Sequence, residues 1–169
     1  MNAFFDKKIF DPELAERVKS EFIDNMSYIT NLEIKSYKKV SVKDESHWLW
    51  LAVDDMLKSN IGPEYSLLQR VTILRYDPGD YFDRHQDGPW NSAVSFHLPK
   101  HFYGGIEICE KSEFEGGEFF IDDENIPFQK GRLFTHGWDT WHGIRKLTKG
   151  RRWSLDFLIF KEGNEHSLI

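Results

Sequence analysis

The second half of the chain alternates between short apolar runs and turn-forming residues, and this pattern restricts the fold more than any other feature. From Tyr65 onward, Gly and Pro separate runs rich in Val, Ile, Phe, Trp and Tyr, and no convincing helical pattern follows. Runs of this composition and length predict β-strands. The strands are expected at 67–76, 81–87, 91–98, 104–109, 117–121, 131–135, 141–146 and 152–160.

About eight short strands joined by both long and short connections favour a jelly-roll over a sandwich of uniform hairpins. The expected fold class is therefore mainly β with N-terminal helices, built on a double-stranded β-helix core of the cupin-like kind. A chain of 169 residues is expected to form one domain. Within it, 1–65 would be a helical N-terminal support and 66–160 the double-stranded β-helix.

Two helices are expected in the N-terminal region, where they would support one sheet. Asp11 precedes a proline, which suits the first turn of a helix, and apolar residues recur at helical spacing to about Asn25. A second helix is expected to begin near Asp44 and to stop around 59–63. The intervening residues 27–43 could hold one or two strands.

Composition narrows the class of function and of partner. The net charge of −6 disfavours a protein that binds nucleic acid through its phosphate backbone. The single cysteine, Cys109, excludes an internal disulfide and a Cys-rich zinc site, and we expect it to be a half-buried structural thiol. Because no secretory signal or membrane-spanning run is evident, a cytoplasmic protein without a membrane partner is expected.

His85 and Asp87 form an H-x-D pair at the end of a predicted strand. Alternate side chains on a strand share a face, so the two could bind one metal ion. Such a pair is common by chance, and the alternative is a surface histidine beside a solvated aspartate. Its position after the strand at 67–76 and a Pro-Gly turn, at the rim of the predicted barrel, favours a functional role.

His142 would add a third ligand, and two histidines with one carboxylate can occupy one face of an octahedral metal. Residues 148–150 resemble a turn that leads into Arg152. In a hairpin centred near Leu147, His142 and Arg152 would lie opposite each other with their side chains on one face. The sequence therefore predicts a guanidinium close to the metal.

A guanidinium beside a metal suits a ligand that chelates the metal at one end and has a carboxylate at the other. Ser154 shares the face of Arg152 and could donate a hydroxyl, and Tyr76 could supply another. Arg151 should point to the opposite face, so it receives no role in the site.

These motifs together resemble the Fe(II)/2-oxoglutarate-dependent dioxygenases, most closely the prolyl 4-hydroxylase and procollagen lysyl hydroxylase branch. The similar segments occur in the order RYDPGDYFDRHQD (75–87), FEGGEF (114–119), GRL (131–133), HGI (142–144) and GRRWSL (150–155). The resemblance implies that His85, Asp87 and His142 bind iron, that Arg152 binds the distal carboxylate of 2-oxoglutarate, and that Tyr76 assists. Many collagen prolyl hydroxylases have Lys at this anchor, whereas Arg152 matches the lysyl hydroxylase-like and bacterial members.

The resemblance also implies an activity: hydroxylation of a C–H bond with 2-oxoglutarate and O2 as co-substrates, Fe(II) as the metal, and release of succinate and CO2. Ascorbate is expected to keep the iron reduced. The family favours a prolyl or lysyl residue in a peptide or protein as substrate, and a free amino acid or another small metabolite is the alternative. A nucleobase demethylase is disfavoured by the acidic composition.

Several alternatives remain open beside this interpretation. His136 and Lys146 have the same ten-residue spacing as His142 and Arg152, but Lys146 precedes the predicted turn, so the second pair is preferred. A zinc hydrolase could use the same three ligands but would not need the arginine. A cupin-like binding protein could hold a metal without turnover.

Four aromatic residues surround the proposed ligands in the sequence. They could form the walls of a substrate pocket, or they could pack in ordinary loops. These residues are Trp90, Trp138, Trp141 and Tyr103.

Overall fold

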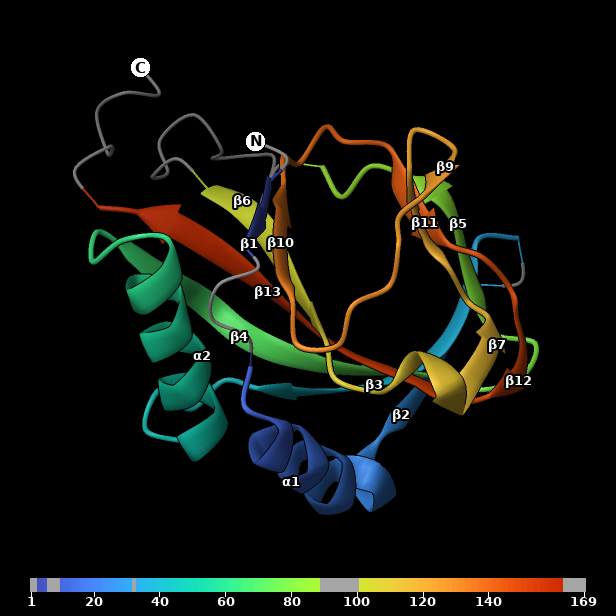
Figure 1. Cartoon of the computed structure of the whole chain (residues 1–169), viewed down its shortest axis with the longest axis horizontal. Coiled ribbons are helices and arrows are strands. Elements are labelled where there is room, and N and C mark those ends of the chain that lie inside the picture. Colours follow the sequence, from blue (N-terminus) through green and yellow to red (C-terminus); the bar gives the residue numbers. More distant parts are fainter. Residues whose placement is uncertain (1–2, 6–9, 32, 89–100, 163–169) are drawn as a thin grey trace.

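The protein is described by a computed structural model that covers residues 3–5, 10–31, 33–88 and 101–162 (Figure 1). It is mainly β, with two α-helices outside a curled antiparallel sheet, as the jelly-roll prediction requires. The helices are α1 (Pro12–Phe22) and α2 (Trp48–Asn60), with the 3-10 helices η1 (Ile23–Asn25) and η3 (Lys111–Glu113). The strands are β1 (Ala3–Phe5), β2 (Ser27–Asn31), β3 (Lys35–Val42), β4 (Tyr65–Tyr76), β5 (Tyr81–His85), β6 (His101–Glu107), β7 (Phe114–Gly116), β8 (Phe119–Ile121), β9 (Glu124–Asn125), β10 (Leu133–His136), β11 (His142–Ile144), β12 (Leu147–Gly150) and β13 (Arg152–Lys161).

One eleven-stranded sheet forms the body of the protein, in the order β1-β10-β6-β13-β4-β3-β5-β11-β8-β9, with β2 added to β3. A separate two-stranded sheet joins β12 to β7. In Figure 1 the large sheet curls, so that β5 and β11 on one side face β6 and β10 on the other. The inside of this curl holds the predicted site, whereas the helices pack outside it.

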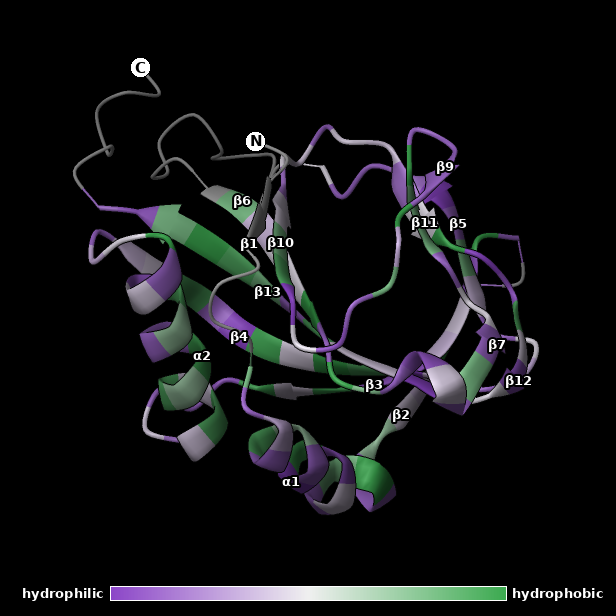
Figure 2. Ribbon diagram, in the orientation of Figure 1, coloured by the Kyte–Doolittle hydropathy of each residue, from purple (hydrophilic) through white to green (hydrophobic). Residues whose placement is uncertain are grey.

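The helices cover the outer face of the sheet with apolar side chains. In α1 the Asp11 carboxylate accepts a hydrogen bond from the backbone N–H of Glu13, as expected for a helix cap. Val53 of α2 and Val71 of β4 are both fully buried where that helix packs on the strand. Figure 2 shows the hydrophobic residues gathered along β4 and β13 and on the helix faces toward them.

The second helix begins later than the sequence suggested. The Asp44 side chain accepts hydrogen bonds from the N–H and hydroxyl of Ser46, so these residues form a turn. His47 then caps α2 through its ring nitrogen, which accepts from the N–H of Leu49 at 3.1 Å. Residues 27–43 contain two strands, and β3 lies between β4 and β5 in the main sheet, so residues 1–65 contribute strands as well as helices.

The predicted hairpin between His142 and Arg152 is wrong. Residues 147–150 form β12, which pairs with β7, and β11 pairs with β5 and β8. Arg152 instead lies opposite Tyr76 in the long β13–β4 pairing. The sequence prediction failed because it joined neighbours in the chain, whereas these strands take partners far away in the sequence.

The remaining strands follow the predicted pattern with shifted ends. The strands at 67–76 and 152–160 correspond to β4 and β13, and the strand expected at 81–87 ends at His85. The strand expected at 91–98 lies outside the described residues. Cys109 is fully buried rather than half-buried. Among the described helices, none is long and apolar enough to cross a membrane.

Candidate active site

The pairing of β5 with β11 brings the three predicted metal ligands together. His85 is the last residue of β5 and lies opposite His142, the first residue of β11, while Asp87 follows two positions after His85. The Asp87 carboxylate lies 3.3 Å from Nε2 of His85 through one oxygen and 3.3 Å from Nε2 of His142 through the other. The three potential ligand atoms lie within 4.8 Å of one another. This geometry can close around one metal ion.

Both histidines are oriented by backbone carbonyl groups. Nδ1 of His85 lies 2.7 Å from the carbonyl oxygen of Asp83, and Nδ1 of His142 lies 2.9 Å from that of Thr140. A neutral imidazole that donates from Nδ1 presents the lone pair of Nε2, which is the usual arrangement of a metal-binding histidine. The side chains therefore fit a divalent metal in position, and the carbonyl groups favour the tautomer that frees Nε2 for a metal once its proton is lost.

The electrostatics keep the carboxylate of this group ionised. Burial raises the pKa of Asp87, but hydrogen bonds from His142 and His85 outweigh it and hold the pKa well below its usual range. Burial lowers the pKa of His142, but its hydrogen bond to Asp87, the charge of that carboxylate and its hydrogen bond to Thr140 together outweigh that effect and raise the pKa. An ionised carboxylate between two imidazoles is the donor set that non-haem Fe(II) uses.

His136 lies beside the three ligands without being one of them. Its Nε2 is 3.7 Å from the Asp87 carboxylate, and its ring stacks on Tyr103 with the centroids 5.7 Å apart. Burial lowers the pKa of His136 to about 4, with a further contribution from the charge of His142. Lys146 lies elsewhere, with Nζ 5.6 Å from the Tyr81 ring, so His136 and Lys146 do not form a second site together.

All six residues predicted from the sequence line one cavity of about 310 Å³. Arg152, only 2% exposed, lies opposite Tyr76 across β13 and β4, and its guanidinium carbon is 5.6 Å from the centre of the tyrosine ring. Ser154 follows on the same face of β13. The predicted set is His85, Asp87, His142, Tyr76, Arg152 and Ser154. A cavity of this size lies at the lower end of the range of small-molecule sites, about 300–1,000 Å³.

Glu107 is the main site residue that the sequence did not reveal. It lies opposite Ser154 across β6 and β13, and its carboxylate forms a buried ion pair with Arg152. Burial raises the pKa of Glu107, while the charge of Arg152 lowers it. One oxygen of Glu107 and Nε of Arg152 have no hydrogen-bond partner. A signal existed in the sequence: Glu107 stands between two isoleucines, where a buried charge needs a partner.

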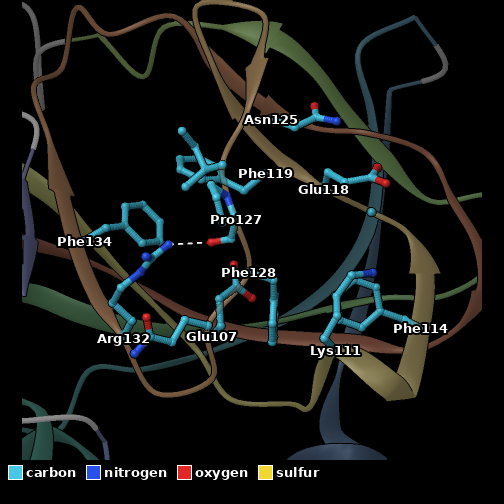
Figure 3. A pocket seen from close by; sticks show the side chains of 13 residues that line it. Glu107, Lys111, Phe114, Glu118, Phe119, Asn125, Pro127, Phe128, Arg132 and Phe134 are labelled. Carbon is cyan, nitrogen blue, oxygen red and sulfur yellow. Dashed lines mark hydrogen bonds between the residues drawn. The ribbon is translucent and has the colours of Figure 1, made fainter. Parts of the chain in front are cut away.

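A second cavity of about 250 Å³ lies beside the first (Figure 3). Glu107, Phe119 and Phe134 line both cavities, so these side chains form the wall between them. Phenylalanine rings make up much of its surface, and Arg132 at its edge donates a hydrogen bond of 2.6 Å to the carbonyl oxygen of Pro127.

The four aromatic residues considered for a substrate pocket differ in position. Tyr103 lines the first cavity, and its hydroxyl donates to the carbonyl oxygen of Gly88 at 3.0 Å. Trp138 and Trp141 are 43% and 38% exposed and do not line that cavity. Trp90 lies outside the described residues. Arg151 is exposed and forms an ion pair with Asp77, as its expected orientation away from the site implies.

Comparison with known proteins rests on structure, since no sequence family and no curated protein matches the chain. A prolyl-4-hydroxylase from Pseudomonas putida superposes with a TM-score of 0.68 at 13% identity, over 96% of this chain and 93% of that one. A Trichoplax adhaerens prolyl hydroxylase in complex with a hypoxia inducible factor peptide gives 0.65 at 12% identity, over 99% and 86%. HygX from Streptomyces hygroscopicus, with nickel, 2-oxoglutarate and hygromycin B bound, gives 0.65 at 13% identity, over 96% and 83%.

These likenesses establish the fold. The chain has the double-stranded β-helix fold of the 2-oxoglutarate- and Fe(II)-dependent oxygenases. Within that class, its fold resembles the prolyl 4-hydroxylase-like branch, as the motifs in the sequence indicated.

Proposed function

We propose that the protein is an Fe(II)- and 2-oxoglutarate-dependent dioxygenase that hydroxylates a C–H bond. The observation that carries this proposal is that His85, Asp87 and His142 converge in the cavity that also holds Arg152. A zinc hydrolase would need the three ligands alone. A buried arginine in the same cavity supports a second, anionic ligand beside the metal.

Each residue has a defined part in this proposal. His85, Asp87 and His142 would hold Fe(II) through two imidazole nitrogens and a carboxylate oxygen. Arg152 would bind the distal carboxylate of 2-oxoglutarate, with the hydroxyl groups of Tyr76 and Ser154 close by on the same wall. Bound Fe(II), together with 2-oxoglutarate and O2, supplies the oxidising power that converts C–H to C–OH and releases succinate and CO2.

Glu107 adds a constraint on how the co-substrate binds. Its carboxylate already contacts the Arg152 guanidinium, so a second carboxylate must share that guanidinium or displace Glu107. Because burial raises the pKa of Glu107, a proton on this group would remove the repulsion between the two carboxylates. The free Nε of Arg152 offers a further donor.

The family resemblance favours a prolyl or lysyl residue in a peptide or protein as the substrate. The peptide bound to the Trichoplax prolyl hydroxylase supports that choice. A free amino acid or another small molecule is the alternative, supported by the small cavity and by the hygromycin B bound to HygX. Ascorbate as the reductant and a cytoplasmic location complete the proposal.

A matched pair of arginine variants tests the proposal. Arg152→Ala should abolish succinate release in the presence of Fe(II), 2-oxoglutarate and O2, and it should weaken 2-oxoglutarate binding far more than metal binding. Arg151→Ala removes the same charge from the exposed neighbour and should leave both unchanged. Equal loss of metal and 2-oxoglutarate in Arg152→Ala would refute the role assigned to this residue. Hydrolytic activity of the zinc-loaded protein in the absence of 2-oxoglutarate would refute the proposal that the protein is an oxygenase.

A further inference from the structure

Four charged side chains line the main cavity without taking part in the site described above. They are Lys35, whose Nζ lies 5.2 Å from the centre of the Phe82 ring, and the group Lys39, Arg70 and Asp156. Within the part of the chain that the structure covers, none of the four has an ion-pair partner within 4.0 Å. Arg70 donates a hydrogen bond only to the amide oxygen of its neighbour Gln69, at 3.0 Å. Three cations and one carboxylate therefore face the cavity without a close ion pair, and only the longer-range attraction of Asp156 for Lys39 and Arg70 offsets their charges.

The sheet register places Asp156 away from the proposed 2-oxoglutarate anchor. Asp156 of β13 lies opposite Thr72, and Lys39 of β3 lies opposite Leu74, so β4 runs between them on one wall. Asp156 and Arg152 share a face of β13 and are four residues apart, which is roughly 13 Å along a strand. A ligand bound by Asp156 would therefore lie along the cavity from a co-substrate held by Arg152.

A bulge in β4 positions Arg70 on this wall. Phe157 pairs with Val71 and Leu158 pairs with Leu68, so Gln69 and Arg70 have no partners in the register. Gln69 has a φ of +71°, a left-handed conformation that is unfavourable for a residue other than glycine. Bulges redirect side chains, and strained residues of this kind gather at functional sites.

The charged groups affect one another's pKa values. Burial lowers the pKa of Lys39, and the charges of Arg70 and Lys35 lower it further, so positive charge is crowded at this position. Burial raises the pKa of Asp156 to about 7, with a further contribution from Asp87. A carboxylate on a ligand would relieve the first effect, and an ammonium group would relieve the second.

We propose that the substrate is a free amino acid bound as a zwitterion, with its ammonium group at Asp156 and its carboxylate at Lys39 and Arg70. This inference rests on the proposed oxygenase function and selects the free amino acid, the alternative substrate class, over the peptide that the family resemblance favours. A prolyl or lysyl residue inside a peptide has neither a free α-ammonium nor a free α-carboxylate, so it could not satisfy both charges. The unpaired cations and the unpaired carboxylate on one wall favour the free form over the peptide.

Isothermal titration calorimetry tests this assignment of the substrate class directly. The protein is loaded with Ni²⁺ and 2-oxoglutarate, and the twenty standard L-amino acids are titrated in four forms: free, N-acetylated, amidated and blocked at both ends. At least one free amino acid should bind, and each singly blocked form of it should bind about tenfold more weakly, because one charge-assisted contact is lost. Absence of binding by every free amino acid overturns the inference. So does a doubly blocked form that binds as tightly as the free one.

Single substitutions test which residue of the protein binds the ammonium group of the amino acid and which binds its carboxylate. Asp156→Asn should remove the preference for the free over the N-acetylated form, and Lys39→Gln should remove the preference for the free over the amidated form. Lys38→Gln is the matched control, because this neighbour points to the other face of β3 and pairs with Asp77 at 2.7 Å. Equal effects of Lys38→Gln and Lys39→Gln would overturn the assignment.

The failure of this inference differs from the failure of the proposed function. If Fe(II) and 2-oxoglutarate bind together but no amino acid does, the oxygenase stands and the substrate class is wrong. If amino acids bind but 2-oxoglutarate does not, the amino-acid site at Lys39, Arg70 and Asp156 is supported and the proposed oxygenase function is wrong. Circular dichroism of every variant confirms that the fold is retained.

Discussion

Replacing Arg152 by Met should destabilise the fold by much more than the loss of one contact. Arg152 is 2% exposed and Glu107 is 6% exposed, so Met would leave the Glu107 carboxylate buried without its ion-pair partner, with only the charge of Arg132 to offset the loss. Removing one partner of a buried ion pair costs about 3–5 kcal/mol. A typical domain has a total stability of about 5–15 kcal/mol, so the loss would be a large share of it.

The loss should depend on pH. Burial already raises the pKa of Glu107, and the charge of Arg152 limits that rise. Without Arg152 the pKa rises further above its unfolded value, so the folded state loses stability as the pH increases through this range. Arg152→Met should therefore be more destabilising at pH 8 than at pH 5.

Urea unfolding of four proteins without metal measures the effect: the parent, Arg152→Met, Glu107→Gln and the double variant, each at pH 5 and pH 8. The double variant removes the orphaned charge, so it should recover most of the stability lost in Arg152→Met. A loss below about 1 kcal/mol in Arg152→Met at pH 8 would refute the reasoning, since a buried unpaired charge cannot cost so little. A double variant no more stable than Arg152→Met at pH 8 would refute it as well.

Other predictions concern stability and reactivity. Asp156→Asn should stabilise the metal-free protein in urea by about 4 kcal/mol at pH 8 and about 2 kcal/mol at pH 5, because a pKa of about 7 against 3.8 makes ionisation costly in the folded state; an equal gain at both pH values contradicts this. Gly150→Ala should lower the free energy of unfolding by more than about 1 kcal/mol, because φ is +78° and the added Cβ would lie 1.9 Å from the carbonyl oxygen of Glu113; an unchanged melting temperature argues against it. Cys109 should not react with Ellman's reagent in the native protein, because burial raises its pKa to about 12; rapid native labelling would show that the thiol is accessible.

The sequence predicted the fold class because the alternation of side chains is strong in the long strands. β4 and β13 carry apolar residues on one face and could be located from the sequence alone. β7 and β12 are short, and the residues of β12 resemble a turn because they end in Gly150. Their pairing brings together chain segments that are more than thirty residues apart, for example through the hydrogen bond from the Thr148 hydroxyl to the carbonyl oxygen of Glu115. Local sequence patterns do not encode such contacts.

The same limit applies to the site. His85 and Asp87 are close in the sequence, so their shared face was predictable, and the family resemblance added His142 and Arg152. Glu107 could not be placed beside Arg152 without knowing that β6 lies next to β13. Lys39 likewise enters the cavity only because β3 lies beside β4.

Asp156 was within reach of the sequence. It follows Arg152 and Ser154 at alternate positions on a predicted strand, so it had to share their face. Extending the alternation beyond the family motif would have identified it. Arg70 lies at the bulge of β4, which local patterns do not reveal.

The most direct test of the central claim is the visible spectrum of the protein after anaerobic addition of Fe(II) and 2-oxoglutarate. We expect one Fe(II) per chain and a weak charge-transfer band that requires both components, and we expect Arg152→Ala to keep the iron but to need far more 2-oxoglutarate for the same band. Protein that binds one equivalent of Fe(II) and shows no such band at saturating 2-oxoglutarate would contradict the account.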